Sequence, residues 1–375
     1  MRVYASNETT DRETRAALTP ETAEKLVRAG FEVRFEPGMG ARADFPDAAF
    51  EAVGAQAQAR EKGLPEADVC LWVGPPPLES VSLMQSGALS AGFLDPFQRK
   101  DVLEGLANRG VQGVSLEMMP RSTLAQKMDA ISSQANIAGY MAVIVAAERL
   151  NRIFPMMMTP AGTISPVKVF VIGIGVAGLQ AIATAKRLGA RVTAFDTRAE
   201  ALEQAESLGA KPLRIDLGET GSTAQGYAKE LTAEQLEQQR QAQAKVCADS
   251  DIVITTAKLF GRPAPRLVGA DVVAGMGHGS IVVDLAAETG GNVEGVRVDQ
   301  EVTTDNGVRL IGHAKLETFA PGASSSMYAN NLTNFLLHFW DGDAKTLNLD
   351  PENELLKGCV VTRDGAIVHE RFRGA

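Results

Sequence analysis

The sequence predicts an α/β protein built from two doubly wound parallel-sheet domains that are joined by long helices. Short segments that are apolar, or that alternate apolar and polar residues, are typical of strands. Along this chain they alternate with helix-forming segments, and this order is typical of parallel sheets covered by helices. The chain has 375 residues, which is enough for two domains that each bury a core. An apolar strand near the middle of the chain runs directly into a glycine-rich turn and a helix, so at least this domain is expected to be Rossmann-like.

The first domain is predicted to combine residues 1–131 with residues 322–375. Thr19 and Pro20 supply an N-cap and a first-turn proline for a helix that stops at Gly30. The run Gly-Pro-Pro-Pro at 74–77 ends a strand abruptly. Strands are predicted at residues 2–5, 31–35, 67–73, 90–94 and 113–117.

The second domain is predicted to span residues 132–321 and to begin with a linking helix at 132–151. The three methionines at 156–158 are interpreted as a strand or as packing filler rather than as a soft binding surface. Gly275-x-Gly277-x-Gly279 leads into a strand instead of a helix, so it is predicted to be a turn and not a second phosphate loop. Further strands are predicted at residues 169–172, 191–195, 251–256, 280–284 and 308–311.

Two further regions lie outside this alternation of strands and helices. The polar, glycine-rich stretch at about 218–235 is interpreted either as a mobile loop or as an exposed connector. A helix at 327–340 is expected to return to the first domain, and a hairpin at 359–370, turning at 363–365, closes the chain.

The glycine-rich turn, Gly173-x-Gly175-x-x-Gly178, carries the first functional hypothesis. The first glycine permits the tight turn, the second lets the backbone approach a pyrophosphate, and the third lets helix and strand pack closely. Asp196 ends the next strand, where a carboxylate accepts from a ribose diol and repels a 2′-phosphate, which favours NAD over NADP. The alternative is a glycine-rich turn in an α/β core that binds nothing. The predicted cofactor-binding residues of this domain are Gly173, Gly175, Val176, Ala177, Gly178, Asp196, Thr197 and Arg198.

Composition excludes several other classes of function. The net charge of −9 and the lack of a run of basic residues argue against nucleic acid as a partner. The three cysteines and four histidines lack the spacing of metal ligands, so no metal is expected, and the cysteines are interpreted as buried thiols. The N-terminus turns polar at once, unlike a signal peptide. The most apolar stretch, residues 169–185, is too short and too interrupted by glycine to cross a bilayer.

Three segments together resemble one family, the proton-translocating nicotinamide nucleotide transhydrogenases. They are Arg121-Ser-Thr-Leu-Ala-Gln126-Lys-Met-Asp129-Ala-Ile-Ser132, the run from Gly173 to Ala190, and Gly226-Tyr227-Ala-Lys-Glu. The likeness extends over essentially the whole chain and is to the NAD(H)-binding domain I, which some bacteria make as a separate α1 subunit. The first segment is similar to the arginine–glutamine–aspartate loop of that domain, and the third is similar to its mobile loop.

The resemblance implies roles for five residues outside the glycine turn. Arg121 would donate to the nicotinamide carboxamide and pair with Asp129. Gln126 would steer the nicotinamide ring, and Ser132 would donate to the carboxamide or the ribose. Tyr227 would close over the nucleotide and exclude water. The alternative, in which Arg121 and Asp129 are only a surface ion pair, stays open.

The related alanine dehydrogenases share the opening pattern Glu13-Thr-Arg15-Ala-Ala-Leu-Thr-Pro20. Reduction of an imine or a keto acid needs a proton donor and a cation for the substrate carboxylate. In alanine dehydrogenases a lysine and a histidine normally supply these groups. At the matching places this chain reads Trp72-Val-Gly-Pro-Pro and Phe93-Leu-Asp95-Pro, so of the family's substrate-binding side chains only Arg15 is present. Transfer of a hydride between two nicotinamides needs no such groups, so their loss favours the transhydrogenase interpretation.

The family implies a reaction that this chain completes only with partners. One dinucleotide fingerprint is present, so NADP(H) would be bound by a partner subunit, and a membrane domain would couple hydride transfer from NADH to NADP⁺ to proton movement. The chain itself would be a homodimer on the cytosolic face of the inner membrane, and the hairpin at 359–370 is a candidate contact. Two alternatives remain, an amino-acid dehydrogenase and a non-catalytic module that senses NAD.

Overall fold

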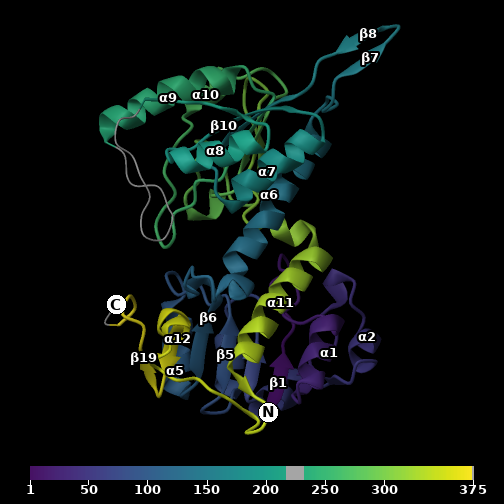
Figure 1. The fold of residues 1–375 in the computed structure, drawn as a ribbon, viewed down its shortest axis with the longest axis vertical. Coiled ribbons are helices and arrows are strands. Elements are labelled where there is room, and N and C mark those ends of the chain that lie inside the picture. The colour runs from purple at the N-terminus through teal and green to yellow at the C-terminus, as the bar shows by residue number, and fades with distance from the viewer. Residues whose placement is uncertain (217–231, 374–375) are drawn as a thin grey trace. The chain divides into compact units, whose positions relative to one another are not determined.

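The computed structural model describes residues 1–216 and 232–373, and these divide into two compact units. Unit 1 comprises Met1–Gln134 with Thr318–Ala375, and unit 2 comprises Ala135–Glu317. Each unit is an α/β domain with its own sheet (Figure 1). The predicted mobile loop at about 218–235, with Tyr227, lies largely outside the described residues.

Unit 1 contains an eight-stranded sheet with the order β19-β18-β6-β5-β4-β1-β2-β3. Its first six strands in chain order are parallel and follow the order 3-2-1-4-5-6 typical of Rossmann-like sheets, with a switch point between β1 and β4. The remaining pair joins antiparallel at the edge, through β18 on β6. The strands are β1 Arg2–Ala5, β2 Glu32–Phe35, β3 Gln56–Ala57, β4 Val69–Leu71, β5 Leu89–Gly92, β6 Gln112–Ser115, β18 Val360–Arg363 and β19 Ala366–Ile367.

Side-chain caps begin two helices of unit 1, at Thr19 for α1 and at Asn353 for α12. The Thr19 hydroxyl accepts from the backbone N–H of Thr22, and the Thr19 N–H donates to the Thr22 hydroxyl, which is a capping box. The helices are α1 Pro20–Arg28, α2 Asp47–Glu51, α3 Arg60–Glu66, α4 Leu78–Leu83, α5 Lys100–Arg109, α11 Pro321–Phe339 and α12 Glu354–Cys359, with a small ladder of β16 Trp340–Asp341 and β17 Thr346–Leu347.

Unit 2 contains a seven-stranded sheet with the order β11-β10-β9-β12-β13-β15-β14. All neighbours are parallel except β14 with β15, and the parallel part again has the order 3-2-1-4-5-6, with its switch point between β9 and β12. The strands are β9 Lys168–Ile172, β10 Arg191–Phe195, β11 Lys211–Pro212, β12 Ile252–Thr255, β13 Ile281–Asp284, β14 Glu301–Thr303 and β15 Arg309–Ile311.

The core of unit 2 gathers the apolar residues of the central strands. Phe170, Val253 and Val282 are fully buried, as expected for strands covered on both faces. The helices are α7 Val176–Arg187, α8 Ala199–Ser207, α9 Ala233–Ala248 and α10 Ala270–Ala274, while α6 Ala130–Arg149 begins in unit 1 and continues into unit 2.

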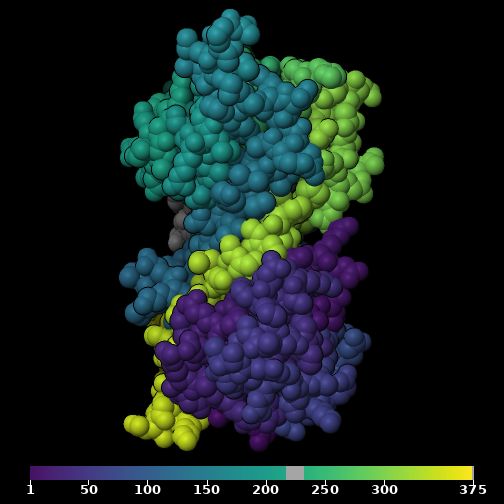
Figure 2. All heavy atoms as spheres, turned by 90° about the vertical axis from the view of Figure 1, so that its right-hand side faces the viewer, coloured from purple at the N-terminus to yellow at the C-terminus, as the bar shows by residue number. Residues whose placement is uncertain are grey.

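A two-stranded hairpin, β7 Met157–Thr159 with β8 Gly162–Ile164, extends from unit 2 as a narrow ribbon and stands out in the space-filling view (Figures 1 and 2). The strand prediction is confirmed for Met157 and Met158, Met156 precedes the strand, and the packing-filler alternative is wrong. Met156, Met157 and Met158 are 58%, 44% and 74% exposed. The hairpin therefore presents its apolar side chains to the outside of the unit.

Among the described residues one helix, α6, has the length and apolar composition needed to span a membrane. Of its most apolar window, 44% is buried in the protein, and core helices commonly have the same properties. The stretch at 169–185, which the sequence offered as the best span, is instead the strand β9, the glycine turn and most of α7.

Candidate functional site

The glycine turn of unit 2 lies at the switch point of the sheet, where β9 and β12 end side by side. Gly173 follows β9 with a φ of +95°, a left-handed conformation that glycine adopts without strain. Its N–H donates to Phe195 O at 2.9 Å, and its carbonyl accepts from the Thr256 hydroxyl at 2.8 Å. The ends of three neighbouring strands thus hold the turn at the position where doubly wound sheets bind their ligands.

The other two glycines have different neighbours. A Cβ placed on Gly178 would lie 2.0 Å from Gly173 O, so only glycine lets α7 pack this closely on the turn. A Cβ placed on Gly175 would meet no atom of the described residues, 1–216 and 232–373, within 4 Å. Gly175 is therefore not required by packing within the protein, and its bare backbone fits the close approach of a phosphate.

The N-terminus of α7 provides donors for that phosphate. Gly175 is the N-cap and offers no side-chain acceptor, and the first turn of the helix has no acidic residue. The N–H groups of Val176, Ala177 and Gly178 begin the helix and have no intrahelical acceptor. Together with the positive end of the helix dipole they suit a pyrophosphate.

Asp196 follows β10 and is engaged by four donors. Its carboxylate accepts from the Ile174 N–H at 2.7 Å, from the Arg198 N–H at 3.0 Å, and from Arg198 Nε and Nη2 at 2.9 and 2.8 Å. Burial alone would raise the pKa of Asp196, but the hydrogen bonds and charge of Arg198 outweigh it, so the pKa lies below its ordinary value. The same pairing raises the pKa of Arg198.

The contacts with Ile174 and Arg198 indicate a structural role for Asp196 besides its predicted contact with the ribose. The carboxylate ties the middle of the glycine turn, at Ile174, to the end of β10, and it neutralises Arg198. A free Arg198 would attract a 2′-phosphate, whereas a paired one does so less. The pair thus strengthens the expectation of a site for NAD rather than NADP.

The predicted loop of unit 1 is ordered by the start of α6. Both oxygens of Asp129 bind Ser132, one to its backbone N–H at 2.9 Å and one to its hydroxyl at 2.6 Å. This is the geometry of an N-cap, which satisfies the open end of the helix. The predicted pair of Asp129 with Arg121 stays a prediction, since the contacts described for this carboxylate are with Ser132.

Helix α11 holds the loop from the other side, which the sequence analysis missed. Asn331 and Asn334 donate from their side chains to the Lys127 carbonyl at 2.9 and 3.2 Å. Asn331 also accepts from the Ser133 hydroxyl at 2.7 Å. Amide side chains recurring at i and i+3 in the predicted helix were the available signal.

The side chains at the tip of this loop are exposed. Arg121 and Gln126 are exposed, and Leu124 is 71% exposed, although the short turn at Gln126–Met128 places Met128 in the core. A loop whose backbone is fixed and whose polar tip is open can present that tip to a bound group.

The predicted site residues therefore fall into two groups, one in each unit. The structure brings together the glycine turn, Thr197 and the Asp196–Arg198 pair in unit 2. It brings together Gln126, Asp129 and Ser132 in unit 1, with Arg121 on the same loop. Tyr227 lies outside the described residues.

The chain's own carboxylates occupy the carboxyl ends of the strands of unit 1, Glu8 at the switch point and Glu117 at the ends of β5 and β6. Glu8 accepts from the N–H groups of Val73 and Gly74 at 2.6 and 3.3 Å. Glu117 accepts from Leu94 N and Asp95 N at 3.2 and 2.6 Å. Burial raises the pKa of both carboxyls to about 7.

Neither of the two positions that the sequence singled out supplies a cation here. The segments 72–76 and 93–96 contain no lysine or histidine, and Asp95 has a φ of +48°. Arg15 is buried in an ion pair with Glu13, at 2.6 Å between Nε and Oε1, and also donates to Gln134. Arg15 is thus held by contacts inside unit 1, as a structural ion-pair partner.

Metal chemistry finds no support among the residues that the structure describes. Within 1–216 and 232–373, no three His, Cys, Asp or Glu side chains form a group that could hold an ion. All three cysteines are buried, as predicted, and burial raises the pKa of Cys70 to about 12.

Two Rossmann-ordered sheets, one with a glycine turn and an uncapped helix at its switch point, define a nucleotide-binding protein of the doubly wound α/β class. Comparison with known proteins narrows this class. Residues 5–138 match the N-terminal domain model, and residues 142–370 the C-terminal domain model, described as alanine dehydrogenase/PNT. The chain belongs to the alanine dehydrogenase/PNT family.

Individual relatives lie mostly on the transhydrogenase side of that family. The chain is 43% identical to the first part of NAD(P) transhydrogenase subunit alpha of Rhodospirillum rubrum, over 100% of this chain and 99% of the relative. It is similar to the crystal structure of transhydrogenase from Sinorhizobium meliloti, with a TM-score of 0.89 and 41% identity over 98% of this chain and 100% of the other. Alanine dehydrogenase of Halomonas elongata is 28% identical, over 90% of this chain and 86% of the relative. The resemblance stated from the sequence is confirmed.

Proposed function

We propose that this chain is the NAD(H)-binding component of a proton-translocating transhydrogenase. It would present NADH for direct hydride transfer to NADP⁺ on a partner subunit, and a membrane domain would couple that transfer to proton movement. The observation that carries the proposal is the match from end to end with the Rhodospirillum rubrum transhydrogenase subunit. The chain itself would then lie on the cytosolic face of the membrane and act only with its partners.

The chemistry of this reaction agrees with the side chains of both units. A hydride leaves C4 of one nicotinamide and arrives at C4 of the other, so no oxygen or nitrogen gains a proton. The protein has to position the rings at about 3–3.5 Å and exclude water. The glycine turn, α7 and Asp196 would hold the pyrophosphate and ribose, while Arg121, Gln126 and Ser132 would orient the nicotinamide.

Two buried carboxyl groups at the carboxyl ends of the strands of unit 1 argue against the amino-acid dehydrogenase alternative. A substrate carboxylate entering there would meet Glu8 and Glu117, which already use the local backbone N–H groups. Two like charges in one site repel, and a carboxylate without donors remains poorly compensated. If NAD⁺ and L-alanine gave NADH with the purified chain, this alternative would be revived.

We propose the exposed hairpin β7–β8 as a contact of the expected homodimer, in place of the hairpin at 359–370. The latter is used inside unit 1, since β18 pairs with β6 and buries Val360, Val361 and Thr362. The former exposes Met157, Met158 and Ile164, the kind of apolar surface that marks an interaction site.

The proposal is tested by reconstitution with an NADP-binding partner and stopped-flow transfer between NADH and an NADP analogue. Gln126→Asn moves the amide by one methylene, so single-turnover transfer should slow about 100-fold, because displacement by about 1 Å is that damaging. NADH affinity should change less than about threefold, since the pyrophosphate contacts are intact. Gln98→Asn, on another exposed loop of unit 1, is the matched control and should leave both values unchanged.

Two outcomes would count against the proposal. Equal losses of transfer rate and NADH affinity in Gln126→Asn would remove the positioning role of that residue. NADH binding without any hydride exchange with the NADP-loaded partner would favour the NAD-sensing module instead.

A further inference from the structure

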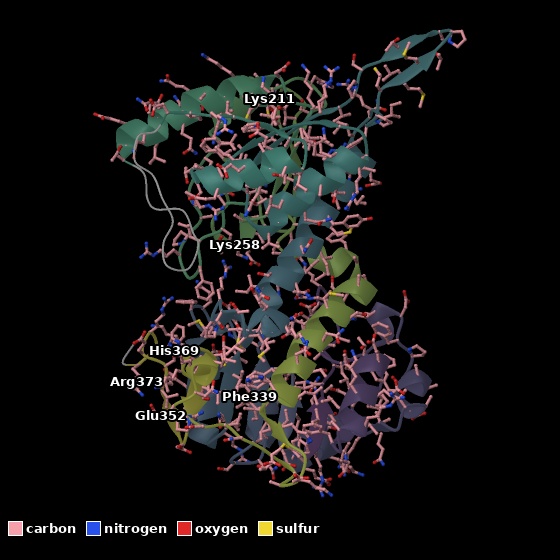
Figure 3. All side chains as sticks on the ribbon, viewed as in Figure 1. Lys211, Lys258, Phe339, Glu352, His369 and Arg373 are labelled. Atoms are coloured by element: carbon pink, nitrogen blue, oxygen red, sulfur yellow. The ribbon has the colours of Figure 1, made fainter. Side chains whose placement is uncertain are left out.

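A basic cavity lies in unit 2 at the amino ends of β9, β10 and β11, and none of the functions above uses it. Its volume is about 440 Å³. Four cations line it, Lys168, Lys186, Arg191 and Lys211, together with a single carboxylate, Asp249. Figure 3 labels Lys211. This concentration of positive charge is unexpected in a chain whose net charge is −9.

The register of the sheet explains why the cations converge. Lys168 and Arg191 are direct partners on the parallel strands β9 and β10, and Thr193 is paired with Lys211 on β11. Residues paired in a parallel ladder share a face, as do residues two apart along a strand. Lys168, Arg191, Thr193 and Lys211 therefore project from one face of three neighbouring strands.

Lys186 joins this group from the last turn of α7. Gly209, with a φ of +81°, lies under its side chain, and a Cβ there would be 3.3 Å from Lys186 Cε and 3.6 Å from Nζ. The glycine thus gives the aliphatic stem room to lie across the end of α8. The ammonium group reaches the cavity with its stem supported.

The charges of these cations are mostly uncompensated by the described residues. Lys168 pairs with Asp249 at 2.5 Å. Lys186, Arg191 and Lys211 have no ion pair within residues 1–216 and 232–373. Neighbouring cations repel one another, and a concave surface lined by positive charges concentrates anions.

We propose that this cavity binds an anion that carries phosphate groups. Lysine and arginine are the usual partners of phosphate oxygens, and the Thr193 hydroxyl adds a neutral donor. The volume is within the range of about 300–1,000 Å³ found for small-molecule sites. A free polyphosphate and a phospholipid headgroup share this chemistry.

The cavity is separate from the glycine turn. Lys168 begins β9 and Gly173 follows its end, and a rise of about 3.3 Å per residue separates the two positions by about 16 Å. An anion in the basic cavity therefore leaves the turn free, and NADH should not displace it.

The experiment titrates inorganic pyrophosphate into the chain by calorimetry, with and without saturating NADH. A pyrophosphate site that survives NADH is expected in the parent chain. In Arg191→Ala/Lys211→Ala its affinity should fall at least about tenfold, because bonds to charged groups contribute about 1.5–3 kcal/mol each. Asp249→Asn frees Lys168 and should tighten binding about twofold to fivefold, as expected for an exposed pair.

The control variant Lys62→Ala/Lys100→Ala removes the same charge from exposed positions of unit 1 and should bind like the parent. Sedimentation with vesicles of phosphatidylglycerol, against phosphatidylcholine, tests the lipid source with the same variants. Pyrophosphate binding alone assigns a soluble ligand, and vesicle binding lost in the double variant assigns a headgroup. Binding of neither probe, binding displaced by NADH, or equal binding by both double variants overturns the proposal. NADH affinity, measured in the same titrations, reports on the cofactor site independently.

Discussion

Replacing Gly175 or Gly178 of the nucleotide turn by alanine should distinguish a glycine needed for NADH binding from a glycine needed for protein stability. Gly175 has a φ of −87°, which alanine adopts freely, and a Cβ there would meet no atom of the part of the chain that the structure describes. Gly175→Ala should therefore leave stability unchanged or raise it by about 0.4–1 kcal/mol, through the smaller entropy of the unfolded chain. The added methyl would project into the approach of the pyrophosphate. A crowding penalty of about 1–3 kcal/mol would weaken NADH binding about 5-fold to 150-fold.

Gly178→Ala should behave in the opposite way. Its Cβ would lie 2.0 Å from Gly173 O, whereas real Cβ contacts are essentially never closer than 3.0 Å. The turn or the helix must move by about 1 Å, and such overpacking destabilises by about 1–3 kcal/mol. For a unit of the size of Ala135–Glu317 this lowers Tm by about 2–12 °C.

The assay pairs thermal unfolding with fluorescence titration of NADH. Gly277→Ala is the matched control, because its Cβ would make only an ordinary contact, 3.6 Å from Ser280 Oγ, in a turn predicted to bind nothing. It should change neither Tm nor NADH affinity. If Gly175→Ala bound NADH like the parent, or lost stability as Gly178→Ala does, the assignment of Gly175 to the phosphate contact would be refuted.

Two further predictions concern charged groups. Asp196→Asn removes the counter-charge of Arg198. The preference for NADH over NADPH should therefore fall roughly 10- to 100-fold, which corresponds to the free energy of one charged hydrogen bond. Equal weakening of the binding of both nucleotides in titrations would contradict this. Glu117 has its pKa raised from 4.5 to about 7, so the folded protein binds the extra proton and its stability falls as pH rises from 4.5 through 7. Glu117→Gln should reduce the slope of Tm against pH in that window, whatever its constant effect on Tm, and an unchanged slope would exclude Glu117 as the group responsible.

Local signals in the sequence located most of the strands and helices. The strands predicted at 2–5 and 191–195 have those bounds in the structure, because short apolar alternation and flanking breakers are properties of the segment itself. Helix α11 starts at Pro321, six residues before the predicted 327. Ser325 and Ser326 bond back to the carbonyls of Pro321 and Gly322, and a small polar run of this kind lacks the apolar period that announces a helix.

The sequence identified the residues of the candidate site better than it identified their partners. The glycine turn and Asp196 were found because their spacing is fixed by the geometry of one βαβ unit. The support of Lys127 by Asn331, and that of Gly173 by Thr256, join positions 204 and 83 residues apart. Such contacts depend on the fold of the whole unit and leave no local pattern. The methionine run predicted a strand, which the structure has at Met157–Thr159, but the exposure of that strand depends on the surrounding structure.

The comparison of the two switch points explains why one chain would hold only one nucleotide. Both units have the strand order 3-2-1-4-5-6, so each brings backbone N–H groups to the edge where such sheets bind ligands. In unit 2 the donors at the start of α7 meet no acidic side chain in the first turn of that helix. In unit 1 the helix after the first strand, α1, is capped by the Thr19 side chain, and the N–H groups that follow β4 and β5, those of Val73, Gly74 and Asp95, already serve Glu8 and Glu117. A pyrophosphate there would have to displace the carboxylates of Glu8 and Glu117 from these donors and would then lie beside both of them. A second nucleotide is thus opposed by electrostatics as well as by the lack of a glycine turn, in agreement with the proposal that the hydride acceptor is bound by another chain.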